Sequence, residues 1–325
     1  MTNRINWIDQ AKGIGILLVV VGHMTIPLNL SILIFSFHMP LFFFISGYLF
    51  NEKKYAYDFK TVAFSKFSTL VWPFITFTFL ALLLRSTYDF KNTIETFDYV
   101  RFLIGMDSIN VPLWFLTALF SAEIIFSQIV RYSKHRLEVI VGVVSVLVTI
   151  GFINAYFWHI EALYNIHIAL IALSFFLTGW LFKKYGVLET VDNIKSLIIY
   201  LFISSMTLFY FALNNSKLDM LESNYENIMY VFLAAFTGIV SSILLAKLLQ
   251  KIKYIKAIFS YLGENSLIIL ATHTIYAPFI LATIGHLPYR LDRILTIVFI
   301  FMSIEIINKY LPFMVKNHGL RVDKK

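Results

Sequence analysis

The stretch SILIFSFHMPLFFFISGYLF, residues 31–50, decides the fold class. It contains no Asp, Glu, Lys or Arg over its whole length. About 20 predominantly apolar residues in a row form a helix that is long enough to cross the hydrocarbon core of a bilayer. The stretch therefore predicts a membrane-spanning helix.

The remainder of the chain has the same character. Of its 325 residues, 59% are hydrophobic and only 14% are charged, and the mean hydropathy is +0.76. Because a soluble domain carries roughly a quarter of its residues as charges, this composition excludes a water-soluble fold. The apolar segments are long and do not alternate as barrel strands do. We therefore expect an all-α polytopic protein with the lipid bilayer as its partner. The chain has no cysteine, which excludes disulfides and thiolate metal sites.

The chain contains ten stretches that are long enough to cross a bilayer. The loop of residues 85–111, the largest segment between them, is too short to hold a catalytic domain. We therefore predict one transmembrane domain over residues 1–325 with no extracytoplasmic domain. The approximate limits of the spans are 9–28, 31–50, 61–84, 112–130, 137–157, 165–182, 195–213, 227–248, 263–285 and 291–314.

The loop charges predict the orientation, because Lys and Arg are retained on the cytoplasmic side of a membrane. If the N-terminus is cytoplasmic, 21 of the 27 basic residues fall inside. Both termini are then cytoplasmic, and the net charge of +8 is mainly a topology signal that does not indicate nucleic-acid binding. The basic residues that remain outside are Arg85, Lys91, Arg101, Lys217, Arg290 and Arg293.

Lys12 and His23 are the most informative polar pair. Eleven residues turn a helix through about 1100°, which returns to within roughly 20° of the same face at a distance of about 16 Å. One stripe of the first span thus places a cation at the cytoplasmic mouth and an imidazole deep within. The simpler interpretation is that Lys12 flanks the membrane and that His23 is a hydrogen-bonded packing residue.

Among the other polar groups within predicted spans, the site candidates are His38 and Ser46 in the second and His273 in the ninth. An ionisable residue inside a span costs a few kcal/mol and is a functional candidate. Each group also has a structural interpretation, as a packing histidine or as a small residue at a helix contact. We expect His38 and His273 to line one cavity. Glu123 and Glu305 are expected to neutralise either His273 or each other.

Four stretches together resemble the acyltransferase 3 family of membrane acyltransferases. They are WIDQAKGIGILLVVVGH at residues 7–23, FHMPLFFFISGYLF at 37–50, PLWFLTALF at 112–120 and LGENSLIILATHTIY at 262–276. The resemblance implies an integral membrane enzyme that moves an acetyl or other short acyl group from acyl-CoA, without a metal. The implied acceptor is a sugar hydroxyl of a cell-surface polysaccharide or of a lipid-linked precursor.

The resemblance also implies a place for the protein within the family and within the cell. Some relatives carry an additional extracytoplasmic esterase-like domain. This chain looks like the stand-alone branch, close to fucose-acetylase-like sugar O-acetyltransferases. Its expected location is the bacterial cytoplasmic (inner) membrane, which it would cross several times.

Family motifs assign the expected site residues. The basic-x10-His motif matches Lys12 and His23, and the Phe-Phe-x-x-Ser-Gly motif ends at Ser46 and Gly47. A third motif, two arginines three apart near the start of the third helix, is half present at Lys66. The resemblance and the depth of the polar groups together give two sets. The catalytic set is His23, His38 and His273, and the coenzyme-binding set is Lys12, Lys66 and Ser46.

The coenzyme imposes its own geometry. An acyl-CoA is polyanionic and is made in the cytoplasm, so its phosphates are expected at a basic inner rim of Lys12, Lys53, Lys54 and Lys66. The pantetheine arm would then follow the first helix and deliver the thioester near His23, about 16 Å away. Histidine suits the task of removing the proton of a hydroxyl near neutral pH.

The competing class is a multi-span transporter or flippase for an envelope precursor. Its intramembrane histidines and carboxylates would relay protons or bind a solute. Such a fold is expected to show an internal repeat of helices, which the sequence does not display. Hydrolysis of acetyl-CoA, or thermal stabilisation by coenzyme A, distinguishes the two classes.

Overall fold

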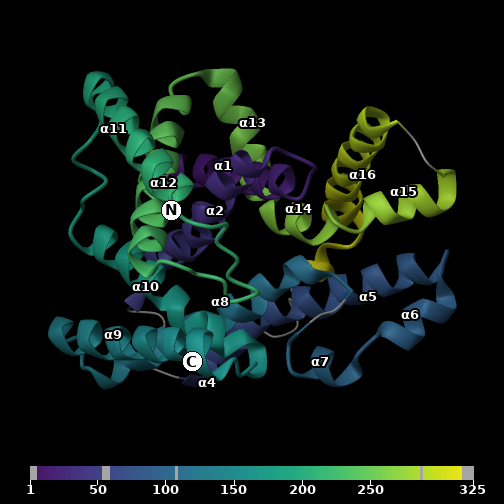
Figure 1. Cartoon of the computed structure of the whole chain (residues 1–325), viewed down its shortest axis with the longest axis horizontal. Helices are drawn as coiled ribbons and strands as arrows, with labels where there is room; N and C mark the ends of the chain where they lie inside the picture. The colour runs from purple at the N-terminus through teal and green to yellow at the C-terminus, as the bar shows by residue number, and fades with distance from the viewer. Residues whose placement is uncertain (1–5, 53–58, 107–108, 286–287, 317–325) are drawn as a thin grey trace. The chain divides into compact units, whose positions relative to one another are not determined.

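The structure is a computed structural model that describes residues 6–52, 59–106, 109–285 and 288–316. This part of the chain is helical throughout and forms no strand (Figure 1). The main helices are α1 (Asn6–Gly22), α2 (Leu28–Leu49), α4 (Phe59–Lys66), α5 (Trp72–Ser86), α6 (Phe90–Thr96), α7 (Tyr99–Leu103), α8 (Trp114–Tyr132), α9 (Leu137–Ile153), α10 (Ile166–Lys184), α11 (Ile194–Leu213), α12 (Ile228–Leu249), α13 (Lys253–Glu264), α14 (Ser266–Thr272), α15 (Tyr276–Ile284) and α16 (Tyr289–Tyr310).

Within the described residues, seven helical stretches are long and apolar enough to cross a membrane. They coincide with the second to eighth predicted spans. The bent pair α14 and α15 raises the number to eight if the pair forms one span, in the place of the predicted span 263–285. The helix α1 has 17 residues, and α16 carries Asp292, Arg293, Glu305 and Lys309. The all-helical membrane class is thus confirmed, and the total of ten stays a prediction.

The chain divides into two compact units, each built from several segments. Unit 1 comprises residues 1–51, 138–160 and 170–266, and unit 2 comprises residues 52–137, 161–169 and 267–325. Each unit therefore draws on distant parts of the sequence. The single domain predicted for residues 1–325 stays a prediction.

In unit 1, α1 and α2 form an antiparallel hairpin. The ring of Trp7, near the start of α1, packs edge-on against Tyr48, near the end of α2, with the ring centroids 5.1 Å apart. At the other end of the hairpin, Gly22 faces the ring of Phe35. These two contacts determine which residues of α1 lie opposite which residues of α2. Both helices also pack on α12.

Two helix crossings in unit 1 are so close that only glycine fits. A methyl group on Gly47 of α2 would overlap the backbone of α10, and one on Gly179 of α10 would overlap the backbone of α2. Gly13 of α1 and Gly263 of α13 form a second reciprocal pair. Small residues at such crossings let helix backbones approach each other in a membrane. Gly47, next to Ser46, therefore provides a close helix contact.

The loop of residues 185–193, between α10 and α11, is tied to the ends of two helices. Tyr48 of α2 donates a hydrogen bond to Glu189 at 2.9 Å. The buried ammonium group of Lys247, in α12, donates to Asp192 at 3.1 Å and to two backbone carbonyls of the loop. Buried charges are tolerated when they are paired and hydrogen-bonded. Segments that the sequence places on the cytoplasmic side thus lie together in this unit.

In unit 2, α4 and α5 join through the π-helical turn Phe67–Val71 into one stretch of 28 residues. The indole of Trp72 donates a hydrogen bond to the carbonyl of Phe313 at 2.7 Å, and so fixes the turn after α16 against α5. The helices α15 and α16, in the yellow-green part of Figure 1, pack on each other. The helices α4 and α5 both contact α8.

Candidate active site

His23 and His38 meet at one phenylalanine ring in unit 1. The ring of Phe35 lies 6.0 Å from that of His23 and 4.9 Å from that of His38, measured between centroids. The sequence brings these residues together because the hairpin of α1 and α2 turns between them. Two predicted catalytic histidines therefore share one site.

The depth of His23 differs from the expectation. His23 lies one residue after the end of α1, and its side chain is exposed, whereas His38 is buried in α2. The reason is that α1 ends at Gly22, so that the hairpin can turn before Pro27. The imidazole predicted to lie deep within a span is therefore accessible at the end of the helix.

All three predicted catalytic histidines have the same hydrogen-bond arrangement. In His23, His38 and His273, Nδ1 lies 2.9, 2.8 and 3.1 Å from the backbone carbonyl four residues earlier. A carbonyl can only accept, so in the neutral imidazole Nδ1 carries the hydrogen and Nε2 carries the lone pair. This contact fixes both the tautomer and the orientation of the ring. Each Nε2 is thereby prepared to accept a proton.

His167 has the opposite arrangement. Its Nδ1 accepts a hydrogen bond from the backbone N–H of Ala162 at 3.1 Å, so its hydrogen lies on Nε2. This contact closes the turn before α10. A packing role therefore suits His167, whose tautomer differs from that of His23, His38 and His273.

A cation adjoins the pair of histidines. The ammonium group of Lys217 lies 3.6 Å from the centroid of the Phe35 ring, which is a cation–π contact. Within the part of the chain that the structure describes, no carboxylate lies at ion-pair distance from this ammonium group. Among the described residues, the positive charge thus lies over the ring that His23 and His38 both contact, with no acidic side chain at ion-pair distance.

Hydrogen bonds within the loop of residues 214–227 hold Lys217 in this place. The backbones of Asp219 and Asn224 pair as a short bridge. The Glu226 carboxylate accepts from the backbone N–H of Ser216, the residue before Lys217, at 2.6 Å. A loop with its own hydrogen bonds loses less entropy when it holds a side chain in one position. The loop therefore presents its lysine in a defined position.

Lys12 and Ser46 lie near the other end of the hairpin. Gly15 of α1 contacts Phe42 of α2, and Trp7 contacts Tyr48. Lys12 lies between these two contacts along α1, and Ser46 lies between them along α2. Their expected role as coenzyme-binding residues stays a prediction, and this placement is consistent with it.

Lys66 is held in an ion pair. Its ammonium group pairs with the carboxylate of Glu123 in unit 2, where both side chains are largely buried. Glu123 thus has Lys66 as its partner, whereas the sequence had suggested His273 or Glu305. A coenzyme phosphate would have to compete with this carboxylate for Lys66. The expected rim residues Lys53 and Lys54 lie outside the described residues.

His273 lies in unit 2, at a break between α14 and α15, which are bent by 46°. We had expected one continuous span here. In an unbroken helix, the N–H of Ile275 would donate to the carbonyl of Ala271. It donates to Thr272 instead, and the Ala271 carbonyl accepts from the side chain of Asn110 at 2.8 Å. A buried side chain thus satisfies the carbonyl that the break releases.

The sequence contained one signal for the helix break at His273 and one for the unusual position of Lys217, and both were missed. Pro278 cannot donate to the carbonyl of Thr274, so a helix that contains it favours a start near Tyr276. Lys217 is one of the few basic residues that the charge rule leaves outside, and this exception marks it. The role of Asn110 depends on a partner 161 positions away and has no local signal.

The extent of the family match decides the identity. A family model described as an acyltransferase domain matches residues 5–307, nearly the whole chain. The chain belongs to the acyltransferase 3 family. No curated protein and no solved structure matches it. This membrane acyltransferase has all six predicted site residues within the matched range.

Proposed function

We propose that this acyltransferase moves an acetyl or other short acyl group from acyl-CoA to a sugar hydroxyl of a cell-surface polysaccharide or of its lipid-linked precursor. The observation that carries the proposal is the shared arrangement of His23 and His38. Each has Nδ1 on a backbone carbonyl, which leaves Nε2 as the proton acceptor, and both rings contact Phe35, over which the ammonium group of Lys217 lies. A base and a nearby cation are the two groups that acyl transfer to a hydroxyl requires.

The proposed reaction uses His23 as the general base. Its Nε2 accepts the proton of the acceptor hydroxyl while the hydroxyl oxygen attacks the thioester carbonyl carbon. Lys217 stabilises the oxyanion that forms on the carbonyl oxygen. The C–S bond then breaks, and the sulfur of coenzyme A leaves with the proton of the imidazolium. The products are an acyl ester and free coenzyme A.

Binding of the donor at Lys12 gives the first prediction. A charge-assisted hydrogen bond contributes about 1.5 to 3 kcal/mol, so Lys12→Ala is expected to raise the KM for acetyl-CoA by about tenfold or more. Lys12→Arg is expected to keep most of the affinity, because it retains the positive charge. The measurement is acetyl-CoA hydrolysis by the purified protein, together with the rise in its Tm on addition of coenzyme A.

The exposed Lys195→Ala serves as the control for general loss of charge. It is expected to leave both the KM and the rise in Tm unchanged. If the natural sequence shows neither hydrolysis nor stabilisation by coenzyme A, the proposed donor is wrong. Equal effects of Lys12→Ala and Lys195→Ala would remove Lys12 from the donor site.

The proposed orientation in the bacterial cytoplasmic membrane places both termini inside. Because the chain lacks cysteine, single cysteines report the side directly. Tyr99→Cys and Glu222→Cys are expected to react with an impermeant thiol reagent in intact cells. Arg136→Cys and Lys253→Cys are expected to react only after the cells are opened. The reverse pattern would contradict the proposed orientation.

A further inference from the structure

Unit 2 contains a cavity of about 290 Å³ beside the helix break that holds His273. It is lined by Arg85, Tyr88 and Asp89 at the end of α5 and by Thr274 and Pro278 after the break. Small-molecule sites in proteins occupy about 300 to 1,000 Å³. The cavity is therefore of a size that suits a single ring and not an extended chain.

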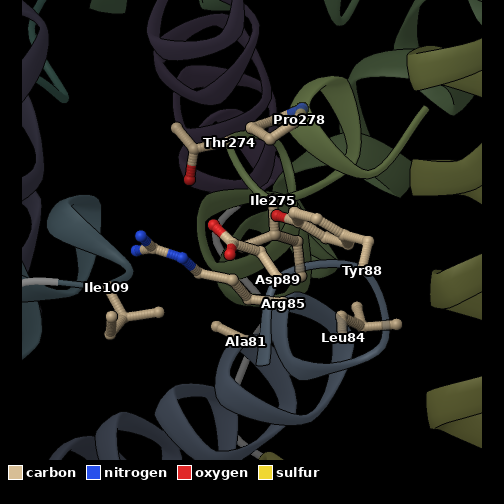
Figure 2. A pocket seen from close by; sticks show the side chains of 9 residues that line it. All are labelled: Ala81, Leu84, Arg85, Tyr88, Asp89, Ile109, Thr274, Ile275 and Pro278. Carbon is tan, nitrogen blue, oxygen red and sulfur yellow. The ribbon is translucent and has the colours of Figure 1, made fainter. Parts of the chain in front are cut away.

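The backbone of the break also indicates a binding site. Irregular backbone at membrane depth is tolerated where it is buried in protein or lines a polar cavity. Here the side chain of Asn110 connects the two sides of the break, since it donates to Ala271 and accepts from the hydroxyl of Thr274 at 3.3 Å. Because these contacts hold the break open, Thr274 remains at the wall of the cavity. Figure 2 shows its hydroxyl directed toward the polar groups of α5.

The lining combines both signs of charge with a hydroxyl donor. Figure 2 shows the polar side chains of Arg85, Tyr88 and Asp89, which all line the cavity. Burial raises the pKa of Tyr88 above the usual tyrosine value, so its hydroxyl keeps its proton and can donate. One guanidinium and one carboxylate give the site no net charge. Such a site disfavours anionic and cationic ligands and provides donors and acceptors for a ring with several hydroxyl groups.

We propose that this cavity binds one neutral sugar ring of the acceptor, with Arg85, Asp89 and Thr274 hydrogen-bonded to its hydroxyl groups. The proposal rests on the proposed function, since it names the class of acceptor that the enzyme would acylate. Arg85 and Asp89 would then determine specificity for neutral over charged sugars. His273 immediately precedes Thr274 in the sequence, so a histidine adjoins the lining of the cavity at the same break.

Protection of a single cysteine tests the proposal independently of catalysis. Leu84→Cys places a thiol in the lining, and Leu83→Cys places one on the same helix outside it. Methyl α-D-glucopyranoside is expected to slow alkylation of Leu84→Cys by N-ethylmaleimide, by about threefold at twice its Kd. Glucuronate and glucosamine, the charged counterparts, are expected to protect weakly. The reactivity of Leu83→Cys is expected to stay unchanged.

Second substitutions identify the groups that bind the sugar. Arg85→Ala or Asp89→Asn, added to Leu84→Cys, is expected to abolish protection, whereas Tyr99→Phe is expected to leave it intact. Equal or better protection by glucuronate, no protection by the neutral sugar, or protection that survives both substitutions would overturn the proposal. Acetyl-CoA hydrolysis on the same proteins separates the two ideas. If the protein hydrolyses acetyl-CoA but the sugar does not protect Leu84→Cys, the proposed acceptor cavity is wrong. If the sugar protects Leu84→Cys but acetyl-CoA is not hydrolysed, the proposed donor is wrong.

Discussion

His23→Ala is expected to lower acyl transfer by a factor of about 10² to 10⁴, the usual cost of removing a general base. This loss corresponds to about 3 to 5 kcal/mol of barrier. The physical reason is that the hydroxyl of a sugar is a weak nucleophile until its proton is removed. His23 provides a basic Nε2 at an exposed position at the end of α1. Stabilisation by coenzyme A is expected to persist, because the proposed site of the donor phosphates is near Lys12 and not at His23.

Exposure of His23 allows a sharper form of this test. Free imidazole can reach an alanine at this position, so it is expected to restore part of the turnover of His23→Ala. His135→Ala is the matched control, because His135 is also exposed and its imidazole contacts Glu52. That variant is expected to keep its turnover. Unchanged turnover in His23→Ala, or an acyl adduct isolated on another residue, would contradict the role of general base.

Long apolar helices are the part of the fold that could be predicted from the sequence. Seven spans were located correctly because an apolar run bounded by charges specifies a membrane helix by length alone. The break at residues 273–275 was not predicted, since the surrounding residues stay apolar and the mean hydropathy continues across it. The reach of α1 was also overestimated, because the apolar residues beyond Gly22 belong to the turn of the hairpin.

The candidate site could likewise be predicted from the sequence only in part. The basic-x10-His spacing made Lys12 and His23 candidates, and the depth of His38 in an apolar span made it a third candidate. Their common feature, an Nδ1–H fixed by a carbonyl, became visible only in the structure. Lys217 could not be placed, because it comes from a loop 182 positions after Phe35 and no periodicity connects them. Tertiary contacts of this kind have no signature in a single sequence.

Lys217→Met is expected to lower turnover by about 10² to 10³, the usual cost of removing one oxyanion donor. Methionine keeps an unbranched side chain but removes the charge that lies over Phe35. An oxyanion exists only in the transition state, so kcat is expected to fall while the KM for acetyl-CoA changes little. The measurement is steady-state kinetics at several donor concentrations.

Two comparisons separate this role from a structural one. Lys217→Arg keeps a cation that can stack on an aromatic ring, so it is expected to retain more activity than Lys217→Met. Lys91→Met removes a lysine that pairs only with exposed Glu95 in the described chain, and it is expected to behave as the natural sequence does. If Lys217 serves only to anchor the loop of residues 214–227, Lys217→Met will lower the Tm, and kcat will fall only in proportion to the folded fraction. A charge that stabilises the transition state cannot be removed without raising the barrier. An unchanged kcat in Lys217→Met would therefore show that Lys217 does not stabilise the oxyanion.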